Sequence, residues 1–291
     1  MQIQSILLSS VVFGAFSMLC YGISDILSGM VAKKNSATKL TLWYFAIGSV
    51  ILAAMGLLLP MPHISVTDIA ALALLSVISA AGLFSFYKGL RVGKVSVIVP
   101  VSATWSLITV LIGALLLKEG LNTVQYIGIA LIILGTVLIS IKIRYLIGLK
   151  LNKLAAGIPY AILSMVLWGF LYSGIGVISQ QMHNWLWPVL INTIGSMIVM
   201  LLYVLSRKPD ISFPGGISKY LILLWIATGV AGFLFYSMGT STGYISVVGP
   251  ISAAAPLITV ILAMVVLKEK VSLHQAIGIA LIILGLIAIV Y

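Results

Sequence analysis

The nine-residue string IGIALIILG occurs at residues 127–135 and again at residues 277–285. Laying residues 93–140 over residues 243–290, a shift of 150, gives 24 identities in 48 positions. Shared aliphatic residues are common among apolar helices, but matched polar residues, prolines and glycines are not. The matched pairs include Gly93 and Gly243, Ser96 and Ser246, Pro100 and Pro250, Ser102 and Ser252, Lys118-Glu119 and Lys268-Glu269, and Gln125 and Gln275. The chain therefore contains an internal duplication.

The preceding parts of the two copies agree more faintly. The segment SMLCYG at 17–22 resembles SMVLWG at 164–169, and Gly48-Ser49 resembles Gly195-Ser196, both at a shift of 147. Gly82 matches Gly232 at the shift of 150. We therefore expect two structural repeats, residues 1–145 and residues 146–291.

The composition is that of a membrane protein. Of the 291 residues, 62% are hydrophobic and 7% are charged, against about a quarter charged in a soluble domain. A helix needs about 20 apolar residues to cross the hydrocarbon layer. Segments of this kind lie at about 6–31, 40–59, 68–90, 95–117, 122–142, 155–180, 185–206, 217–239, 245–267 and 271–291. The sequence predicts an all-α polytopic membrane protein with ten transmembrane helices.

Five helices in each copy fix how the copies are related. Because five is odd, the second copy enters the membrane from the opposite side, which gives two inverted five-helix repeats. Many secondary transporters have this organisation, with the substrate bound near the bilayer midplane between the repeats.

Each duplicated block also resembles a known family. The blocks Gly93–Gly135 and Gly243–Gly285 each run from a small-residue turn through a proline-containing helix to a Lys-Glu turn and a GxxLIxxG helix. They resemble the two EamA domains of the drug/metabolite transporter superfamily. The resemblance implies a ten-helix transporter of the cell membrane with a central cavity between its halves and a small metabolite as cargo, without specifying which metabolite.

The distribution of basic residues predicts an orientation. Cytoplasmic loops are enriched in Lys and Arg. The loops after the first, third, fifth, seventh and ninth helices and the helix ends beside them carry 15 of the 16 Lys and Arg residues, and the opposite face carries only Lys118. This count places both termini outside the cytoplasm, whereas the family resemblance implies cytoplasmic termini. We keep the charge-based orientation as the expectation.

Only five acidic residues are present, and one lies inside a span. Asp25 falls within the first apolar segment, where an unpaired carboxylate is costly. It pairs with Lys88 or Arg91 as a structural ion pair, or it forms part of a substrate or proton site. Glu119 lies in the first Lys-Glu turn, and we expect it to be a solvated residue at a helix boundary.

Aromatic and polar residues within the spans are the other candidates for a cavity lining. Aromatic rings bind amines through cation–π contacts, and an amide deep in a span faces the bundle interior. The complete set of cavity candidates is Tyr21, Asp25, Tyr87, Ser102, Trp105, Trp168, Tyr172, Asn192, Tyr236 and Ser252. Packing within the helices is the alternative for each ring.

Matched small residues and prolines are the candidate hinges. Gly-x-x-x-Gly permits close helix approach, and it occurs in both copies before the fourth and ninth helices. A proline inside a helix removes one backbone hydrogen bond. The candidate gating or hinge residues are Gly89, Gly93, Pro100, Gly239, Gly243 and Pro250.

These features predict a secondary active transporter that exports small organic metabolites by alternating access. Amino acids and related zwitterions or amines are the expected cargo, with protons as a possible coupling ion. We expect no catalytic site, cofactor, metal or nucleic-acid partner, because basic residues form no continuous face and the spans hold no catalytic cluster. A multidrug or organic-cation transporter is the alternative, and a channel is the alternative of a different class.

Overall fold

The computed structural model describes residues 2–140, 157–267 and 272–290. All the secondary structure in this part of the chain is helical. The first half contains α1 (Gln2–Ala32), α2 (Ala37–Gly56), α3 (Val66–Val92), α4 (Val95–Ala103), α5 (Ser106–Leu111), the π-helix η1 (Ile112–Leu116) and α6 (Thr123–Ser140). The second half contains α9 (Ile158–Gln181), α10 (Trp187–Arg207), α11 (Lys219–Thr242), α12 (Ile245–Ala253), α13 (Pro256–Leu267) and α14 (Leu273–Val290).

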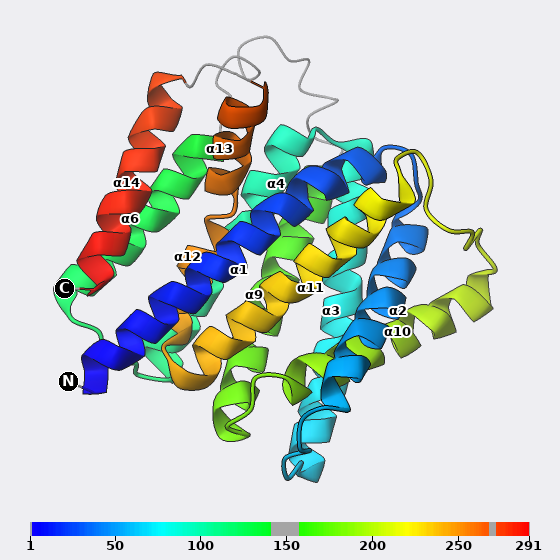
Figure 1. The fold of residues 1–291 in the computed structure, drawn as a ribbon, viewed down its shortest axis with the longest axis horizontal. Coiled ribbons are helices and arrows are strands. Elements are labelled where there is room, and N and C mark those ends of the chain that lie inside the picture. Colours follow the sequence, from blue (N-terminus) through cyan, green and yellow to red (C-terminus); the bar gives the residue numbers. More distant parts are fainter. Residues whose placement is uncertain (1, 141–156, 268–271, 291) are drawn as a thin grey trace.

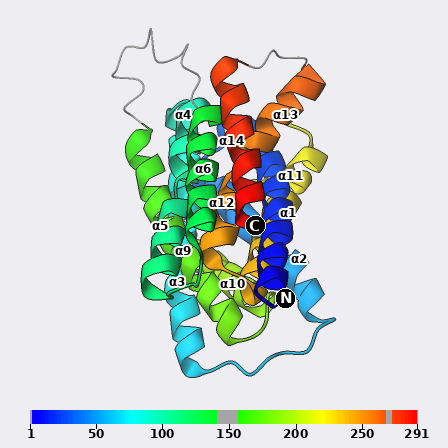
Figure 2. The ribbon, with the colours of Figure 1, turned by 90° about the vertical axis from the view of Figure 1, so that its left-hand side faces the viewer.

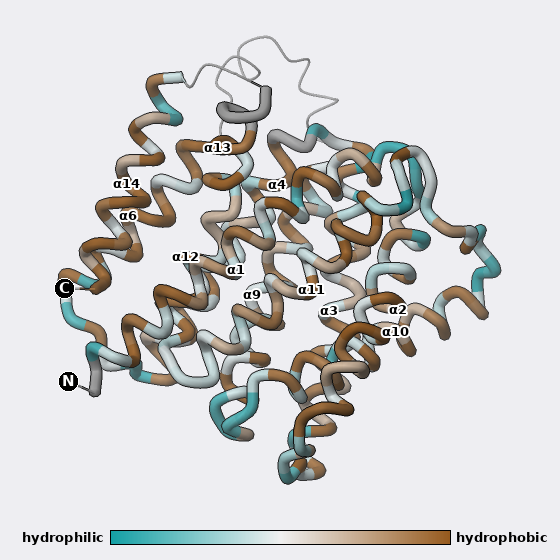
Figure 3. Tube along the Cα trace, in the orientation of Figure 1, coloured by the Kyte–Doolittle hydropathy of each residue, from teal (hydrophilic) through white to brown (hydrophobic). Residues whose placement is uncertain are grey.

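The helices are long and apolar enough to cross a membrane. Within the described residues, nine helical spans meet this criterion, and Thr123–Ile139 is a shorter apolar helix. Figure 3 shows hydrophobic residues along the bodies of the helices and hydrophilic residues mostly in the turns. The predicted fold class, a ten-helix all-α membrane protein, is confirmed. The fourth and ninth predicted helices are each interrupted: α4 is followed by α5 and η1, and α12 by α13.

The two copies of IGIALIILG pack against each other. Helices α6 and α14 lie side by side in Figures 1 and 2. A Cβ atom built on Gly128 would lie 2.8 Å from the carbonyl oxygen of Gly285, and one built on Gly135 would lie 2.6 Å from that of Gly278. Because residue numbers rise on one helix as they fall on the other, these equivalent helices run antiparallel.

Contacts between the halves are reciprocal. Gly232 on α11 packs against the ring of Tyr21 on α1, and Gly82 on α3 packs against Trp168 on α9. Under the sequence duplication, Gly82 is equivalent to Gly232 and Tyr21 to Trp168. Gly22 packs against Ile258 just as the equivalent Gly169 packs against the equivalent Ile108. Reciprocal contacts of this kind are expected when two equivalent units pack about a two-fold axis.

The candidate hinge glycines lie at the tight links between the third and fourth spans of each half. Gly93 follows α3 and Gly243 follows α11, both with extended backbones. The ammonium of Lys33 donates to the Gly93 carbonyl at 2.6 Å, and the amide of Gln180 donates to the Gly243 carbonyl at 2.8 Å. In each half, the end of the first helix therefore holds this link.

The other candidate hinges lie on either side of these links. Gly89 packs against Ile98 of α4, and Gly239 packs against Val248 of α12. Pro100 lies inside α4 and Pro250 inside α12. The helix interruptions come about four residues later, at Thr104–Trp105 and Ala254–Ala255.

Loops rich in lysine meet on one face. The side-chain amide of Asn35 donates to the carbonyl of Gly215, and the backbone N–H of Gly215 donates to the Asn35 side chain. Lys39 forms an ion pair with Asp210 at 2.5 Å. The hydrogen bond from Lys39 lowers the pKa of Asp210 to about 2. We call this side the lysine-rich face and the opposite side, which carries Lys118, the lysine-poor face.

Candidate functional site

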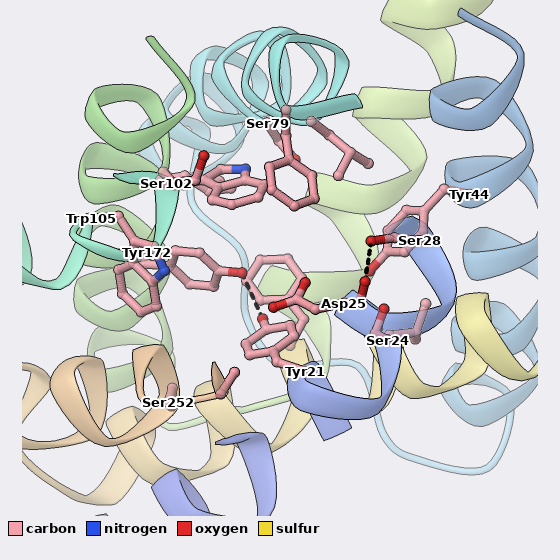
Figure 4. Close-up of a pocket in the computed structure, with 18 of the residues that line it drawn as sticks. Tyr21, Ser24, Asp25, Ser28, Tyr44, Ser79, Ser102, Trp105, Tyr172 and Ser252 are labelled. Carbon is pink, nitrogen blue, oxygen red and sulfur yellow. Dashed lines mark hydrogen bonds between the residues drawn. The ribbon is translucent and has the colours of Figure 1, made fainter. Parts of the chain in front are cut away.

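A cavity lies among helices of both halves (Figure 4). The volume within it that the centres of water molecules can occupy is about 90 Å³. On this measure, about 10–15 Å³ is enough for one water. Residues from α1, α2, α3 and α4 of the first half and from α9, α10, α11 and α12 of the second line it. The cavity is therefore a shared chamber between the two copies.

Most of the residues singled out from the sequence gather here. The cavity lining includes Tyr21, Asp25, Tyr87, Ser102, Trp105, Trp168, Tyr172 and Ser252. Two candidates do not line it. Tyr236 is fully buried behind the wall, where its hydroxyl donates to the Tyr172 carbonyl at 3.0 Å. Asn192 is fully buried in α10, and its side-chain amide has no hydrogen-bond partner within the described residues.

Asp25 presents its carboxylate to the cavity from α1 (Figure 4). The expected ion pair with Lys88 or Arg91 does not form within the described residues. The Lys88 ammonium instead lies 4.7 Å from the centre of the Tyr160 ring. Ser28 donates to the backbone carbonyl of Asp25 at 2.9 Å, and within the described residues no side chain forms a hydrogen bond or ion pair with the Asp25 carboxylate. The carboxylate is therefore open to a ligand.

Stacked rings form the wall opposite Asp25. The rings of Trp105 and Tyr172 stack with centroids 4.1 Å apart. The Tyr172 hydroxyl donates to the Tyr21 hydroxyl at 2.7 Å, across the junction between α9 and α1. Tyr172 occupies the position equivalent to Asp25 in the second copy. The duplicated position thus carries a carboxyl group on one side of the chamber and a phenol on the other.

The two equivalent serines of the cavity have different partners. Ser102 shares a hydrogen bond of 2.8 Å with Ser164. The residue equivalent to Ser164 is Ser17, which donates to the Gly232 carbonyl at 2.8 Å instead. Ser252 is consequently left without a hydrogen-bond partner within the described residues, although it is fully buried. A buried hydroxyl without a partner is costly, and a polar ligand in the cavity would satisfy it.

Sequence reasoning missed the part of the lining that comes from α2 and α11. The additional aromatic residues on these two helices are Tyr44, Phe45, Trp225 and Phe233, and Phe86 of α3 was missed as well. A Cβ atom on Gly229 would lie 2.6 Å from the Tyr44 hydroxyl, so this glycine makes room for the tyrosine. The spacing of Trp225, Gly229 and Phe233, one helical turn apart, is the sequence signal that marks this face of α11.

The chemistry of the lining favours organic cations and zwitterions. Asp25 is its only charged residue, and it contains no Lys, Arg or His. Carboxylates and aromatic faces both attract ammonium groups. Among the described residues, no three His, Cys, Asp or Glu side chains are placed to hold a metal. The chamber can therefore hold a small organic molecule with an amino group.

Comparisons with known proteins agree with this architecture. The EamA-like transporter family matches residues 8–141 and again residues 155–291. An uncharacterized transporter of Clostridium kluyveri is 23% identical over 288 residues, which are 94% of this chain and 90% of that protein. An uncharacterized protein of Methanocaldococcus jannaschii is 34% identical over 137 residues, which are 46% of this chain and 98% of that protein. One solved crystal structure has a similar fold, with a TM-score of 0.75 and 20% identity over 96% of this chain and 97% of the other.

Proposed function

The chain belongs to the EamA-like transporter family, and from this premise we propose that it exports small organic metabolites by secondary active transport. It is a multi-pass transporter of the cell membrane. The proposed cargo is an amino acid or a related zwitterion or amine. The observation that carries this proposal is the shared cavity, with one open carboxylate in an aromatic chamber.

The two sides of the cavity suit the two ends of a zwitterion. The Asp25 carboxylate accepts charge-assisted hydrogen bonds from an ammonium group, and the nearby tyrosine rings add cation–π attraction. The hydroxyl of Ser252 has no hydrogen-bond partner within the described residues, so it is free to donate to a cargo carboxylate. Figure 4 shows Ser252 on the far side of the chamber from Ser24 and Ser28. A phosphorylated cargo is disfavoured because no basic residue lines the cavity.

Alternating access is the proposed transport mechanism. Residues 1–145 and 146–291 are proposed to be inverted repeats that rock around the cavity. The antiparallel packing of α6 and α14 and the reciprocal contacts of Gly82 and Gly232 support this relation. The archaeal relative adds support, because 98% of it aligns with a stretch about as long as one repeat.

Protons are the proposed coupling ion. Asp25 is the only carboxylate in the cavity lining, and ionisable groups within membrane spans are common proton carriers. A cargo ammonium and a proton would use the same oxygen atoms. Protonation of Asp25 would then favour release of the cargo.

An organic-cation transporter is the second candidate. The absence of any cationic side chain from the cavity lining favours it, since nothing there is a counter-ion for a cargo carboxylate. Matched cargoes separate the two candidates: an amino acid, its methyl ester and its decarboxylated amine. Transport of all three, fastest for the amino acid, supports the zwitterion proposal. Transport of the ester and the amine alone supports the organic-cation candidate.

The test is uptake by proteoliposomes that contain the purified chain. We expect saturable uptake of at least one labelled amino acid, accelerated by a proton gradient. Asp25→Asn should lower uptake at least tenfold, whereas Asp210→Asn, which removes an exposed carboxylate from the lysine-rich face, should not. If no amino acid or amine moves under either a cargo or a proton gradient, the proposal is wrong. Uptake that rises linearly with cargo concentration would indicate a channel.

A further inference from the structure

Glu119 does not occupy the solvated turn expected from the sequence. Its carboxylate reaches the start of α12, which lies 126 residues further along the chain. One oxygen accepts the backbone N–H of Ile245 at 2.6 Å, and the other accepts the N–H of Ser246 at 3.0 Å together with the Ser246 hydroxyl. The carboxylate thus caps the first turn of a helix, where the unpaired N–H groups and the helix dipole favour negative charge.

The segment that Glu119 binds is held from several sides. It is the link from α11 to α12, and it lies on the lysine-poor face. Ser10 of α1 accepts the N–H of Tyr244 at 3.1 Å. Gln180 of α9 donates to the Gly243 carbonyl. Among these contacts, Glu119 provides the only charged group, and hydrogen bonds to charged groups are roughly twice as strong as neutral ones.

Below the Glu119 contact, α12 packs tightly against α5 and η1. A Cβ atom on Gly113 would lie 2.8 Å from the Ser246 side chain. One turn further in, Gly249 lies directly against the Thr109 side chain. The next two residues, Trp105 and Ala253, belong to one buried cluster, and both line the cavity. Residues 105, 109 and 113 follow one another at intervals of four residues from the end of the helix break through α5 into η1. We call the contacts of Gly113, Thr109 and Trp105 with α12 the seam.

The seam separates the cavity from the lysine-poor face. At its outer end, an open depression on that face is lined by Lys118, Glu119, Gln180, His183, Gly243 and Tyr244. At its inner end, Trp105 and Ala253 belong to the cavity. Thr109 and Ser246 between them have no exposed surface. The π-helix η1 lies beside this path, and π-helical turns are frequent at functional sites.

We propose that the seam is a gate on the lysine-poor face and that Glu119 is its latch. While the carboxylate holds the start of α12, the cavity is closed from that face. When the contact breaks, α12 separates from α5 and η1, and the depression joins the cavity. The inference rests on the proposed transport function, but the gate can be tested without any cargo.

The test measures the reactivity of a cysteine placed in the seam. The chain has one cysteine, Cys20, so Cys20→Ser gives a background without reactive thiols. Thr109→Cys then places a thiol in the middle of the seam. Thr41→Cys is the matched reporter, because Thr41 is also fully buried and its hydroxyl also bonds its own helix at 2.8 Å. The full-length protein is reacted with N-ethylmaleimide in detergent, and the labelling rates are compared.

Glu119→Gln should raise the labelling rate at position 109 about tenfold and leave the rate at position 41 unchanged. Lys118→Gln, which changes a charge in the same turn, should change neither rate. Ser246→Ala removes one hydroxyl from the latch and should raise the rate at position 109 by a smaller factor. This variant keeps the inference testable if Glu119→Gln does not fold.

Three results would overturn the latch. The first is an unchanged rate at position 109 in folded Glu119→Gln or Ser246→Ala protein. The second is an equal increase in Lys118→Gln, and the third is an equal increase at position 41, which would indicate general loosening. If the seam opens as expected but no cargo moves in proteoliposomes, the latch stands and the proposed function fails.

Discussion

The packing of α6 against α14 gives a quantitative prediction for Gly278→Val. A Cβ atom at this position would lie 2.8 Å from the Gly135 carbonyl oxygen and 2.7 Å from the Ile139 side chain. An ordinary contact needs about 3.4 Å, so the two helices must move apart by about 0.6 Å. Overpacking of this kind costs about 1–3 kcal/mol. Valine has a better helix propensity than glycine, which offsets roughly 0.4 kcal/mol of this loss of stability.

The reciprocal glycine contacts of α6 and α14 give a second, matched prediction. Gly128 is equivalent to Gly278, and a Cβ atom there would lie 2.8 Å from the Gly285 carbonyl oxygen. Gly128→Val should therefore destabilise the protein by the same amount as Gly278→Val, to within about 0.5 kcal/mol. Since either substitution opens the same helix pair, the double variant should lose less than the sum of the two.

The assay is the free energy of unfolding of the purified chain in mixed micelles with increasing denaturing detergent. Gly120→Val is the control, because a Cβ atom on Gly120 meets nothing within 4 Å. It should change the free energy by no more than about 0.5 kcal/mol. If Gly278→Val unfolds with the same free energy as Gly120→Val, close glycine packing does not stabilise this helix pair. Unequal losses at positions 128 and 278 would contradict the two-fold reasoning.

Three further predictions concern the cavity, the lysine-rich face and the orientation. Ser252→Ala should raise the KM for a zwitterionic cargo about tenfold and leave the KM for its decarboxylated amine unchanged, because a hydrogen bond to a charged group contributes roughly 1.5–3 kcal/mol. Equal effects on both cargoes in uptake assays would contradict a hydrogen bond from Ser252 to the cargo carboxylate. The Asp210 carboxyl, whose pKa is lowered to about 2 by Lys39, should keep its ion pair above about pH 4 and lose it as the pH falls through 2. Carboxyl-selective NMR should show that Lys39→Ala returns this pKa toward about 4. A C-terminal reporter that is active only in the cytoplasm should be silent, as the excess of lysine on the other face predicts; a bright reporter reverses the orientation.

The membrane spans could be predicted because they depend on local composition. The segment expected at 40–59 forms α2 from Ala37 to Gly56, and the segment expected at 122–142 forms α6 from Thr123 to Ser140. The interruptions of the fourth and ninth spans were not predicted. Pro100 and Pro250 indicated weakened helices, but the breaks lie after Ala103 and Ala253. The position of a break depends on how the chain packs after the proline, and the proline alone does not determine it.

The candidate site was only partly predictable. Asp25 was identified because a carboxyl group inside an apolar span is costly, and Tyr172 because aromatic residues within the spans are candidates for a cavity lining. Tyr44 and Trp225 were missed because their positions against Gly229 depend on how α2 meets α11. The interpretation of Glu119 as a solvated turn was wrong for a related reason. Its partners lie 126 and 127 residues away, and no local pattern indicates such a contact.

The packing contacts that the two copies share and the cavity residues that differ between them explain different parts of the proposed transport. In the proposed mechanism, equivalent contacts on the two faces would make the two access states close in energy, which a carrier needs in order to alternate between them. A cavity with true two-fold symmetry, however, would bind a cargo equally well in two opposite orientations. Three differences between equivalent positions remove this ambiguity: Asp25 faces Tyr172, Trp105 replaces the equivalent Ala255, and Ser252 has no hydrogen-bond partner within the described residues. If the proposed function holds, the cargo ammonium would have one preferred end of the cavity and would keep the same orientation whichever face is open.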